Sequence, residues 1–440
     1  MIGDGDSDSK IKGKILFTIT ITGSYHRKMK ICIITSSFPS HPNDVVQAPF
    51  LIDFIKGLKK RGHQVFLFTQ NRKEVKENVL EGIEIEWFAW LSSKKPLVQL
   101  NPLNPLDGFR IANLIYSGRK AVLPFIRENR IDACLALWVL PSGYFANYVH
   151  QETRVPYSVW ALGSDIYRYG RNPFLYPTMK RIIQGATGVF ADGFDLTRTV
   201  EKRFGRKCYF LATTRKIPPL PPLIKGGWGG LPKELNRLNK PDKPNEPNKP
   251  NEPNKPKRPY HFLFVGRLEK VKGIDLLLQS MAMLSEDELN VHLTIVGKGN
   301  LEEWVRSFIH RKRLEKWVTL KGNVDDKALA SLYTSSHCVV IPSRSESIPL
   351  VFSEALNFNK DLIVTDVGDM GMLGRQYEVA WVVPPEDPKA LKEMMRRRAE
   401  LPDHDPNGNP PMIRGNEKRA ELKRLFDIET SVERFLADYV

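Results

Sequence analysis

The sequence predicts an α/β protein made of two doubly wound parallel sheets, with an interruption rich in proline between them. Three observations lead to this prediction. Short, continuous apolar runs, typical of strands that are covered on both faces, alternate with segments of helical periodicity. The chain has 440 residues, which is enough for two or three domains. The alternation stops once, near residue 216, and resumes near residue 260.

The first domain is expected over residues 29–215, and its opening βαβ unit is complete. An apolar run at 31–34 is followed by apolar residues at helical spacing from 50 to 58. Three cations and then Gly62 end this pattern, as at many helix C-termini, and a second apolar run follows at 65–68. Further strands are expected at 132–138, 157–161 and 189–191, and a further helix at 195–204.

Two segments fall outside the alternation. Residues 1–28 are interpreted as an N-terminal extension, because Met29 opens the first apolar run. Residues 216–257 are interpreted as an inserted linker, since 12 of the 32 prolines lie between 216 and 259. Proline removes backbone donors, and the segment has no apolar face that could build a core. Its PxxP spacing leaves an SH3-type ligand as the alternative.

The second domain is expected over residues 258–440, where the alternation resumes, with its last helix packing back on the first domain. Strands are expected at 262–265, 291–296, 318–320, 338–341 and 362–364, and helices at 273–284, 301–311 and 389–398. Ligands of such folds bind outside the carboxyl ends of the strands, so each loop that follows a strand is a candidate site.

Composition narrows the classes of partner and of compartment. The formal net charge of +16 favours an anionic partner, which could be a nucleotide, a membrane surface or a nucleic acid. Nucleic acid is disfavoured, because the basic residues are scattered along helices without interleaved aromatic residues. The four cysteines lie far apart without a CxxC pair, which argues against a structural zinc site and favours the cytosol. No run approaches 18 apolar residues, so no membrane span is expected.

Charged side chains follow several of the predicted strands. Arg267 comes directly after the strand at 262–265, and Lys272 lies later in the same loop, ahead of a helix. Two cations at this position can form a phosphate site, although a solvated basic turn is the alternative. Glu346 lies on the loop after another strand, and Glu354 stands eight residues later within a helix. Two such carboxylates can accept hydrogen bonds from sugar hydroxyls.

In this order, these motifs resemble the nucleotide-sugar domain of glycosyltransferase family 4. The family has the GT-B fold, in which two Rossmann-like domains face each other across a cleft. The resemblance covers about residues 29–215 and 258–440 and is strongest from 262 to 385. It implies retaining transfer of a sugar from a nucleoside-diphosphate sugar to a hydroxyl group of a glycan or lipid-linked acceptor, with no metal or other cofactor.

The resemblance also implies roles for individual residues. Arg267 and Lys272 would neutralise the charge that develops on the leaving phosphate. Glu346 would orient the sugar ring, and Glu354 would hold the ribose of the donor. The remaining residues implied at the donor are Gly266, Gly297, Ser347, Ile348, Leu350 and Gly368, and those implied on the acceptor side are Gly163 and Asp165.

The chain departs from the family pattern at several positions, which keeps other functions open. Leu162 stands where the family usually has a histidine, and Asp369 follows Gly368 where a second glycine is usual. The first alternative is therefore a degenerate GT-B protein that binds a nucleotide or glycan without turnover. The second is a nucleotide-sugar epimerase, which the spacing of Glu346 and Glu354 disfavours.

A basic amphipathic pattern adds a possible membrane partner. Apolar residues recur at near-helical spacing from Phe109 to Ile126, accompanied by four cations and by no acid before Glu128. Such a helix can rest on an anionic leaflet, which would make the protein peripheral to the membrane. An ordinary helix that covers the sheet is the alternative.

Overall fold

The computed structural model describes residues 28–39, 48–71, 79–91, 97, 100–101, 104–218, 259–287, 289–401 and 416–437. The predicted extension at 1–28 and the linker at 216–257 lie almost entirely outside these described residues, as does the PxxP segment.

The described N-terminal residues form an eight-stranded sheet in the order β3-β4-β2-β1-β5-β6-β7-β8. Its strands are β1 (Lys30–Ile34), β2 (Gln64–Gln70), β3 (Val79–Leu80), β4 (Ile83–Phe88), β5 (Ala133–Leu137), β6 (Tyr157–Ala161), β7 (Val189–Ala191) and β8 (Tyr209–Phe210). Its helices are α1 (Phe50–Lys60), α2 (Pro105–Asn129), η2 (Val139–Gly143), α3 (Tyr144–Thr153), α4 (Ser164–Arg168), η3 (Tyr169–Arg171), α5 (Tyr176–Gly185) and α6 (Phe194–Phe204). All neighbouring pairs are parallel except β3 with β4.

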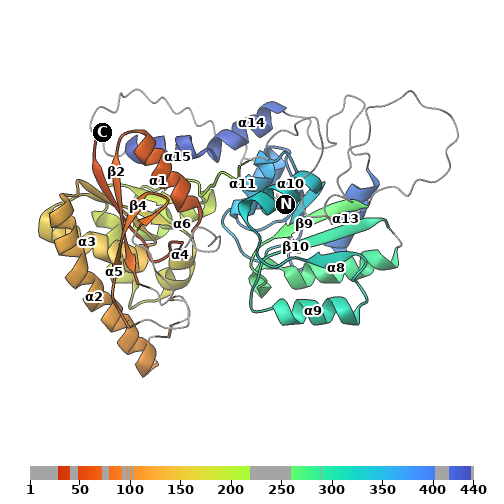
Figure 1. Ribbon diagram of the computed structural model, residues 1–440, viewed down its shortest axis with the longest axis horizontal. Coiled ribbons are helices and arrows are strands. Elements are labelled where there is room, and N and C mark those ends of the chain that lie inside the picture. Colours follow the sequence, from red (N-terminus) through yellow and green to blue (C-terminus); the bar gives the residue numbers. More distant parts are fainter. Residues whose placement is uncertain are drawn as a thin grey trace, which may run out of the picture.

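The described C-terminal residues form a second, fully parallel sheet in the order β11-β10-β9-β12-β13-β14. Its strands are β9 (Tyr260–Val265), β10 (Val291–Val296), β11 (Val318–Leu320), β12 (Cys338–Ile341), β13 (Asp361–Thr365) and β14 (Trp381–Val383). The helices are η4 (Lys270–Lys272), α8 (Ile274–Glu286), α9 (Glu302–Arg311), α10 (Asp326–Ser335), α11 (Leu350–Asn357), α12 (Met370–Gln376), α13 (Pro388–Glu400), α14 (Asn416–Leu425) and α15 (Ile428–Leu436). The predicted pair of doubly wound α/β domains is thus confirmed (Figure 1).

The central strands form because their residues can be buried on both faces. Every residue of β5, β6, β12 and β13 is buried, and each of these strands was predicted from the sequence. Strands β3 and β4 at one edge of the first sheet were not predicted, nor were β8 at its other edge and β14 at an edge of the second sheet. In β4, buried and exposed residues alternate over its first half, as in a strand with one solvated face.

The last helix connects the two domains. Figure 1 shows α14 and α15 crossing from the C-terminal sheet to the N-terminal one, where α15 lies beside α1. Val432 and Phe435 of α15 belong to the buried apolar cluster that also contains Phe54 of α1. The guanidinium of Arg61 pairs with the carboxylates of Glu429 and Glu433 on α15. Since α15 follows the second domain in sequence, these contacts join the domains at their hinge.

Shortening the linker gives a first testable prediction. Deleting residues 220–255 is expected to leave the melting temperature and ligand binding unchanged, because the sequence there has no core-forming pattern and loop-closure entropy varies slowly with length. Differential scanning fluorimetry of the shortened and full chains tests this. A melting temperature lowered by more than about 4 °C, which corresponds to roughly 1 kcal/mol in a domain of this size, would mean that the segment packs on a domain.

Candidate functional site

The candidate site lies where the strand order of the second sheet reverses. Strand β9 stands between β10 and β12, so the connections after β9 and β12 run to opposite sides of the sheet. Ligands of doubly wound folds bind at such a switch point. The loop after β9 carries Gly266, Arg267 and Lys272, and the loop after β12 carries Glu346. The two loops therefore bring together the residues predicted to hold a donor.

Lys272 and Glu346 form an ion pair across these loops. The Lys272 ammonium donates to Glu346 Oε1, and the Ser343 hydroxyl donates to the same oxygen at 3.1 Å. Both side chains are mostly buried, with exposed fractions of 21% and 12%. The pair holds Lys272 at the switch point with its charge neutralised until an anionic ligand competes for it.

Arg267 lies in the same loop but points toward solvent. Its side chain is 55% exposed, and its guanidinium donates to Glu269 Oε1 at 2.8 Å. An exposed ion pair of this kind contributes little to stability, roughly 0–1 kcal/mol. The Arg267 guanidinium can therefore exchange its partner for a phosphate at small cost.

Glu354 has a different environment from the one that the resemblance implies. Its side chain is only 3% exposed, and both carboxylate oxygens are occupied. Arg215 Nε donates to Oε1 at 2.6 Å, and the Tyr333 hydroxyl donates to Oε2 at 2.6 Å. A second guanidinium nitrogen of Arg215 reaches Asp326 Oδ1 at 3.1 Å. Each oxygen keeps a second lone pair, but the burial of Glu354 restricts the access of a ribose hydroxyl to it.

Arg215 is a residue that the sequence analysis missed. It follows β8, ahead of the proline-rich segment, and lies 139 residues from Glu354 in the chain. Because its side chain is only 8% exposed, it forms a buried ion pair between the hinge and the second domain. Arg215 stands next to a segment without hydrophobic periodicity and belongs to no motif, so nothing in the sequence marked it as a functional residue.

At two positions the neighbouring loops come so close together that only glycine, which has no side chain, fits between them. Gly297 has φ +135°, and a Cβ at this position would lie 1.9 Å from the Gly266 carbonyl oxygen. Gly368 has φ +53°, and its Cβ would lie 2.1 Å from the Glu346 carbonyl oxygen. Both conformations are rarely adopted by residues with a side chain. The predicted donor glycines thus let the loop after β10 pack against the loop after β9, and the loop after β13 against the loop after β12.

The remaining residues predicted at the donor lie between the two domains. Ile348 is buried in an apolar cluster that also contains Phe194 and Phe210 of the first domain, so only its backbone can reach a ligand. Leu350 packs against the apolar cluster around α1 and β1 of the first domain. The hydroxyl of Ser347 faces Gly193 of the first domain, where an added Cβ would lie 2.0 Å from it. These residues line the contact between the domains.

On the acceptor side, Asp165 is fully buried and holds a neighbouring loop. Asp165 Oδ2 accepts from the Val139 amide at 2.8 Å, and Oδ1 accepts from the Ile166 amide at 3.1 Å. Burial raises the pKa of Asp165 to about 6 despite these amides. Gly163, at φ +89°, begins the same turn, and Leu162 packs against the apolar cluster around α1. The side chains of Asp165 and Leu162 therefore support, from within, the loops that were predicted to face the acceptor.

Asp369 connects the donor loops to the first domain. Its carboxylate accepts from the Asp195 amide, at 3.0 Å to Oδ1 and 3.2 Å to Oδ2. Asp195 lies in the first turn of α6, whose N-cap residue, Gly193, has no side chain. A carboxylate at this position stabilises the helix N-terminus. Asp369, a residue of the second domain, therefore caps the N-terminus of α6 in the first domain.

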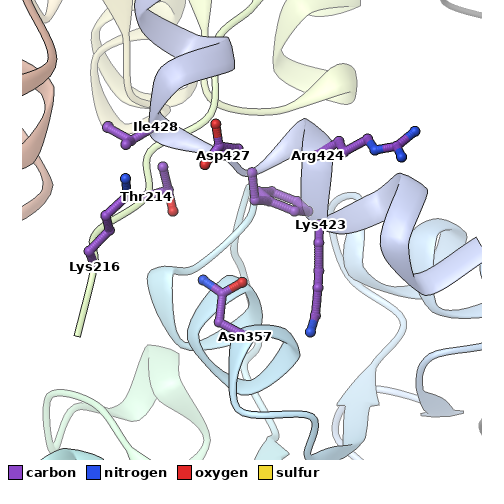
Figure 2. Close-up of a pocket in the computed structure, with 8 residues that line it drawn as sticks. Thr214, Lys216, Asn357, Lys423, Arg424, Asp427 and Ile428 are labelled. Carbon is purple, nitrogen blue, oxygen red and sulfur yellow. The ribbon is translucent and has the colours of Figure 1, made fainter. Parts of the chain in front are cut away.

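A separate hollow of about 270 Å³ lies at the hinge (Figure 2). It is bordered by Thr214 and Lys216 after β8, Asn357 at the end of α11, Lys423 and Arg424 at the end of α14, and Phe426, Asp427 and Ile428 where α15 begins. It contains none of the residues predicted to bind the donor.

Among the described residues, no three His, Cys, Asp or Glu side chains are grouped as a metal site. The helices of the described part of the chain are also too short or too polar to span a bilayer.

Comparison with known proteins supports the sequence resemblance in part. A family model described as glycosyl transferases group 1 matches residues 245–407. An uncharacterized glycosyltransferase of Methanocaldococcus jannaschii is 32% identical over 123 residues, which cover 28% of this chain and 31% of that protein. The chain thus spans about a third of the length of this curated relative.

Solved structures cover nearly the whole chain. Sucrose-phosphate synthase from Thermosynechococcus elongatus has a TM-score of 0.68 at 17% identity, covering 94% of this chain and 98% of that chain. HepE of Anabaena, in complex with UDP and glucose, has a TM-score of 0.64 at 16% identity, covering 93% and 99%. These similarities confirm the predicted GT-B fold, while the assignment to glycosyltransferase family 4 stays a prediction.

Proposed function

We propose that this protein is a glycosyltransferase that moves a sugar from a nucleoside-diphosphate sugar to an acceptor hydroxyl, with retention of configuration and without a metal. The observation that carries the proposal is the position of Lys272 and Glu346 in one ion pair at the switch point, with Arg267 in the same loop. The group 1 family match over residues 245–407 and the UDP-bound HepE structure support it.

The chemistry follows from the charges at the site. As the sugar leaves, negative charge grows on the donor phosphate, and preorganised cations lower the energy of that state. Lys272 supplies one such cation and Arg267, once turned from Glu269, supplies the second. The carboxylate of Glu346, released from Lys272, can then accept hydrogen bonds from the hydroxyls of the sugar ring.

A panel of nucleoside-diphosphate sugars, read by thermal shift and by release of the nucleoside diphosphate, tests this function. A donor present at 100 times its dissociation constant should stabilise the fold by about 2.7 kcal/mol. We expect one base and sugar combination to raise the melting temperature and to be hydrolysed slowly. A panel without any stabilising member would contradict the proposal.

Glu354 provides a specific reason to consider binding without turnover. Both of its oxygens are taken by Arg215 and Tyr333, and Leu162 replaces the histidine usual in the family resembled. A degenerate protein would give the thermal shift but no release of the nucleoside diphosphate. The retained Arg267, Lys272 and Glu346 favour the active enzyme over this alternative.

We further propose that α2 contacts an anionic membrane that carries a lipid-linked acceptor. Leu114, Val122 and Ile126 of α2 are buried, so much of the predicted apolar pattern covers the sheet. However, Phe109 and Tyr116 remain 64% and 68% exposed, and α2 lies at the outer edge of the first domain (Figure 1). Arg119, Lys120 and Arg127 are exposed on the same helix. Exposed aromatic and basic side chains on one helix suit the interface of an anionic leaflet.

Co-sedimentation with vesicles that contain phosphatidylglycerol tests this contact. We expect binding at low salt that weakens at high salt. The double variant Lys120→Ala/Arg127→Ala should bind roughly 30-fold more weakly, since each cation contributes about 1 kcal/mol near the surface. Arg306→Ala/Arg311→Ala on α9 is the charge-matched control and should bind like the wild type. Absence of binding to these vesicles at low salt would contradict the membrane partner.

A further inference from the structure

Asp192 of the first domain lies at the contact between the domains, and none of the roles proposed above involves it. It follows β7 directly, at the carboxyl end of that strand, and its side chain is nine-tenths buried. The next residue, Gly193, packs against the Ser347 hydroxyl and the Asp369 carboxylate of the second domain. The Asp192 carboxyl therefore faces the loop that carries Glu346.

Among the buried carboxyls at this contact, Asp192 is the one with a buried oxygen that lacks a hydrogen-bond partner. Asp165 is held by two backbone amides, and Asp369 by the amide of Asp195. Glu346 is held by Lys272 and Ser343. By contrast, Asp192 Oδ1 has no partner within the described residues.

The hydroxyl oxygen of Ser347 also lacks a hydrogen-bond partner within the described residues. A hydrogen-bonding interaction with Ser347 lowers the pKa of Asp192 in part, so the hydroxyl lies within reach of that carboxyl, yet its oxygen completes no hydrogen bond of normal geometry within the described part of the chain. A buried polar atom without a partner is costly, by about 1–3 kcal/mol, so native proteins rarely retain one without a reason. Here two such atoms, one from each domain, lie beside Glu346.

We propose that Asp192 binds the hydroxyl group of the acceptor, directly opposite the sugar that Glu346 orients. This inference rests on the proposed function and names a residue for its acceptor side. A hydroxyl group both donates and accepts, so it can satisfy Asp192 Oδ1 and the Ser347 hydroxyl together. Asp192 lies on the first domain and faces Glu346, which is implied to orient the donor sugar. An acceptor bound by Asp192 would therefore lie next to the reacting carbon of that sugar.

The protonation state of Asp192 fits this role. Burial is the main cause that raises the pKa of Asp192 to about 8. The neighbouring carboxylates of Asp165 and Glu346 contribute to this rise, and Ser347 opposes it. Lys272, the cation that pairs with Glu346, is not among the groups that shift this pKa. At neutral pH the carboxyl is therefore protonated, and it offers one donor and one acceptor to a hydroxyl group.

The test uses two variants of the full chain and the donor found with the nucleotide-sugar panel, beginning with UDP-glucose. Water serves as the acceptor probe, and the measured quantity is the release of nucleoside diphosphate. Asp192→Asn keeps a donor and an acceptor in the same shape, whereas Asp192→Leu removes both. Asp287→Asn, which alters an exposed ion pair with Lys392, is the matched control.

At pH 7 we expect Asp192→Asn to keep kcat within about threefold and Asp192→Leu to lower it at least about tenfold, the scale of one lost hydrogen bond. The KM for the donor and the affinity for UDP should stay unchanged in both. The wild-type rate should fall above pH 8 as Asp192 ionises, while that of Asp192→Asn should stay level.

Three results would overturn the inference. Asp192→Leu with normal kcat would remove Asp192 from the site, and a parallel loss of UDP affinity would place it at the donor instead. If Asp192→Leu does not fold, identical pH profiles of the wild type and Asp192→Asn would be the overturning result. A wild type that binds no nucleotide sugar contradicts the proposed function itself, which separates that failure from this one.

Discussion

Replacing Arg267 or Lys272 with alanine is expected to lower turnover about 100-fold or more for each residue, the scale for losing one preorganised donor to a developing anion. The physical reason is that both cations lie in the loop after β9, where the leaving phosphate is proposed to bind. Lys272→Ala also leaves Glu346 without its cation, so its effect should exceed that of Arg267→Ala.

Release of the nucleoside diphosphate under saturating donor measures both effects. Arg306→Ala, which removes an exposed cation on α9, is the charge-matched control and should retain full turnover. A double variant Arg267→Ala/Lys272→Ala with wild-type turnover would contradict the assignment of this loop to the phosphate.

The second large effect concerns stability rather than catalysis. Arg215→Met is expected to destabilise the protein by about 3–5 kcal/mol, because it leaves the Glu354 carboxylate buried without its cation. The same substitution combined with Glu354→Leu should recover much of this loss, since a buried ion pair adds little over a well-packed apolar pair. The midpoint of urea unfolding measures each variant.

Asp326→Ala provides the control for this experiment. Asp326 accepts from the same guanidinium, but its side chain is 45% exposed, so its removal should cost no more than about 1 kcal/mol. An unchanged midpoint for Arg215→Met would mean that the pair with Glu354 contributes nothing. That result would favour a Glu354 that is free to take a ribose hydroxyl.

Strands that are buried on both faces could be predicted from the sequence, because such burial restricts their residues to apolar types. The strands β9, β12 and β13 could be predicted because parallel strands between two helical layers consist of continuous apolar runs. Strand β4, next to the edge strand β3, was missed, because Glu84 and Glu86 interrupt the apolar residues of its Ile83–Phe88 segment. Position at the edge of a sheet is a property of the whole fold, which no local window contains.

The candidate site also has one part that the sequence could predict and another that it could not. Lys272 and Glu346 could be expected to meet, although they lie 74 residues apart, because both follow strands of one parallel sheet. The pair of Arg215 with Glu354 and the unpartnered oxygen of Asp192 could not be predicted. Both depend on contacts between the two domains, and a single sequence carries no signal for the relative placement of its domains.

Isothermal titration of the nucleoside diphosphate of the selected donor, in the presence of EDTA, tests the central claim most directly. The account predicts that the wild type binds it without a metal and that Lys272→Ala binds at least about tenfold more weakly, a difference of about 1.4 kcal/mol. Equal affinity of the wild type and Lys272→Ala, or binding that EDTA abolishes, would contradict a metal-independent phosphate site in the loop after β9.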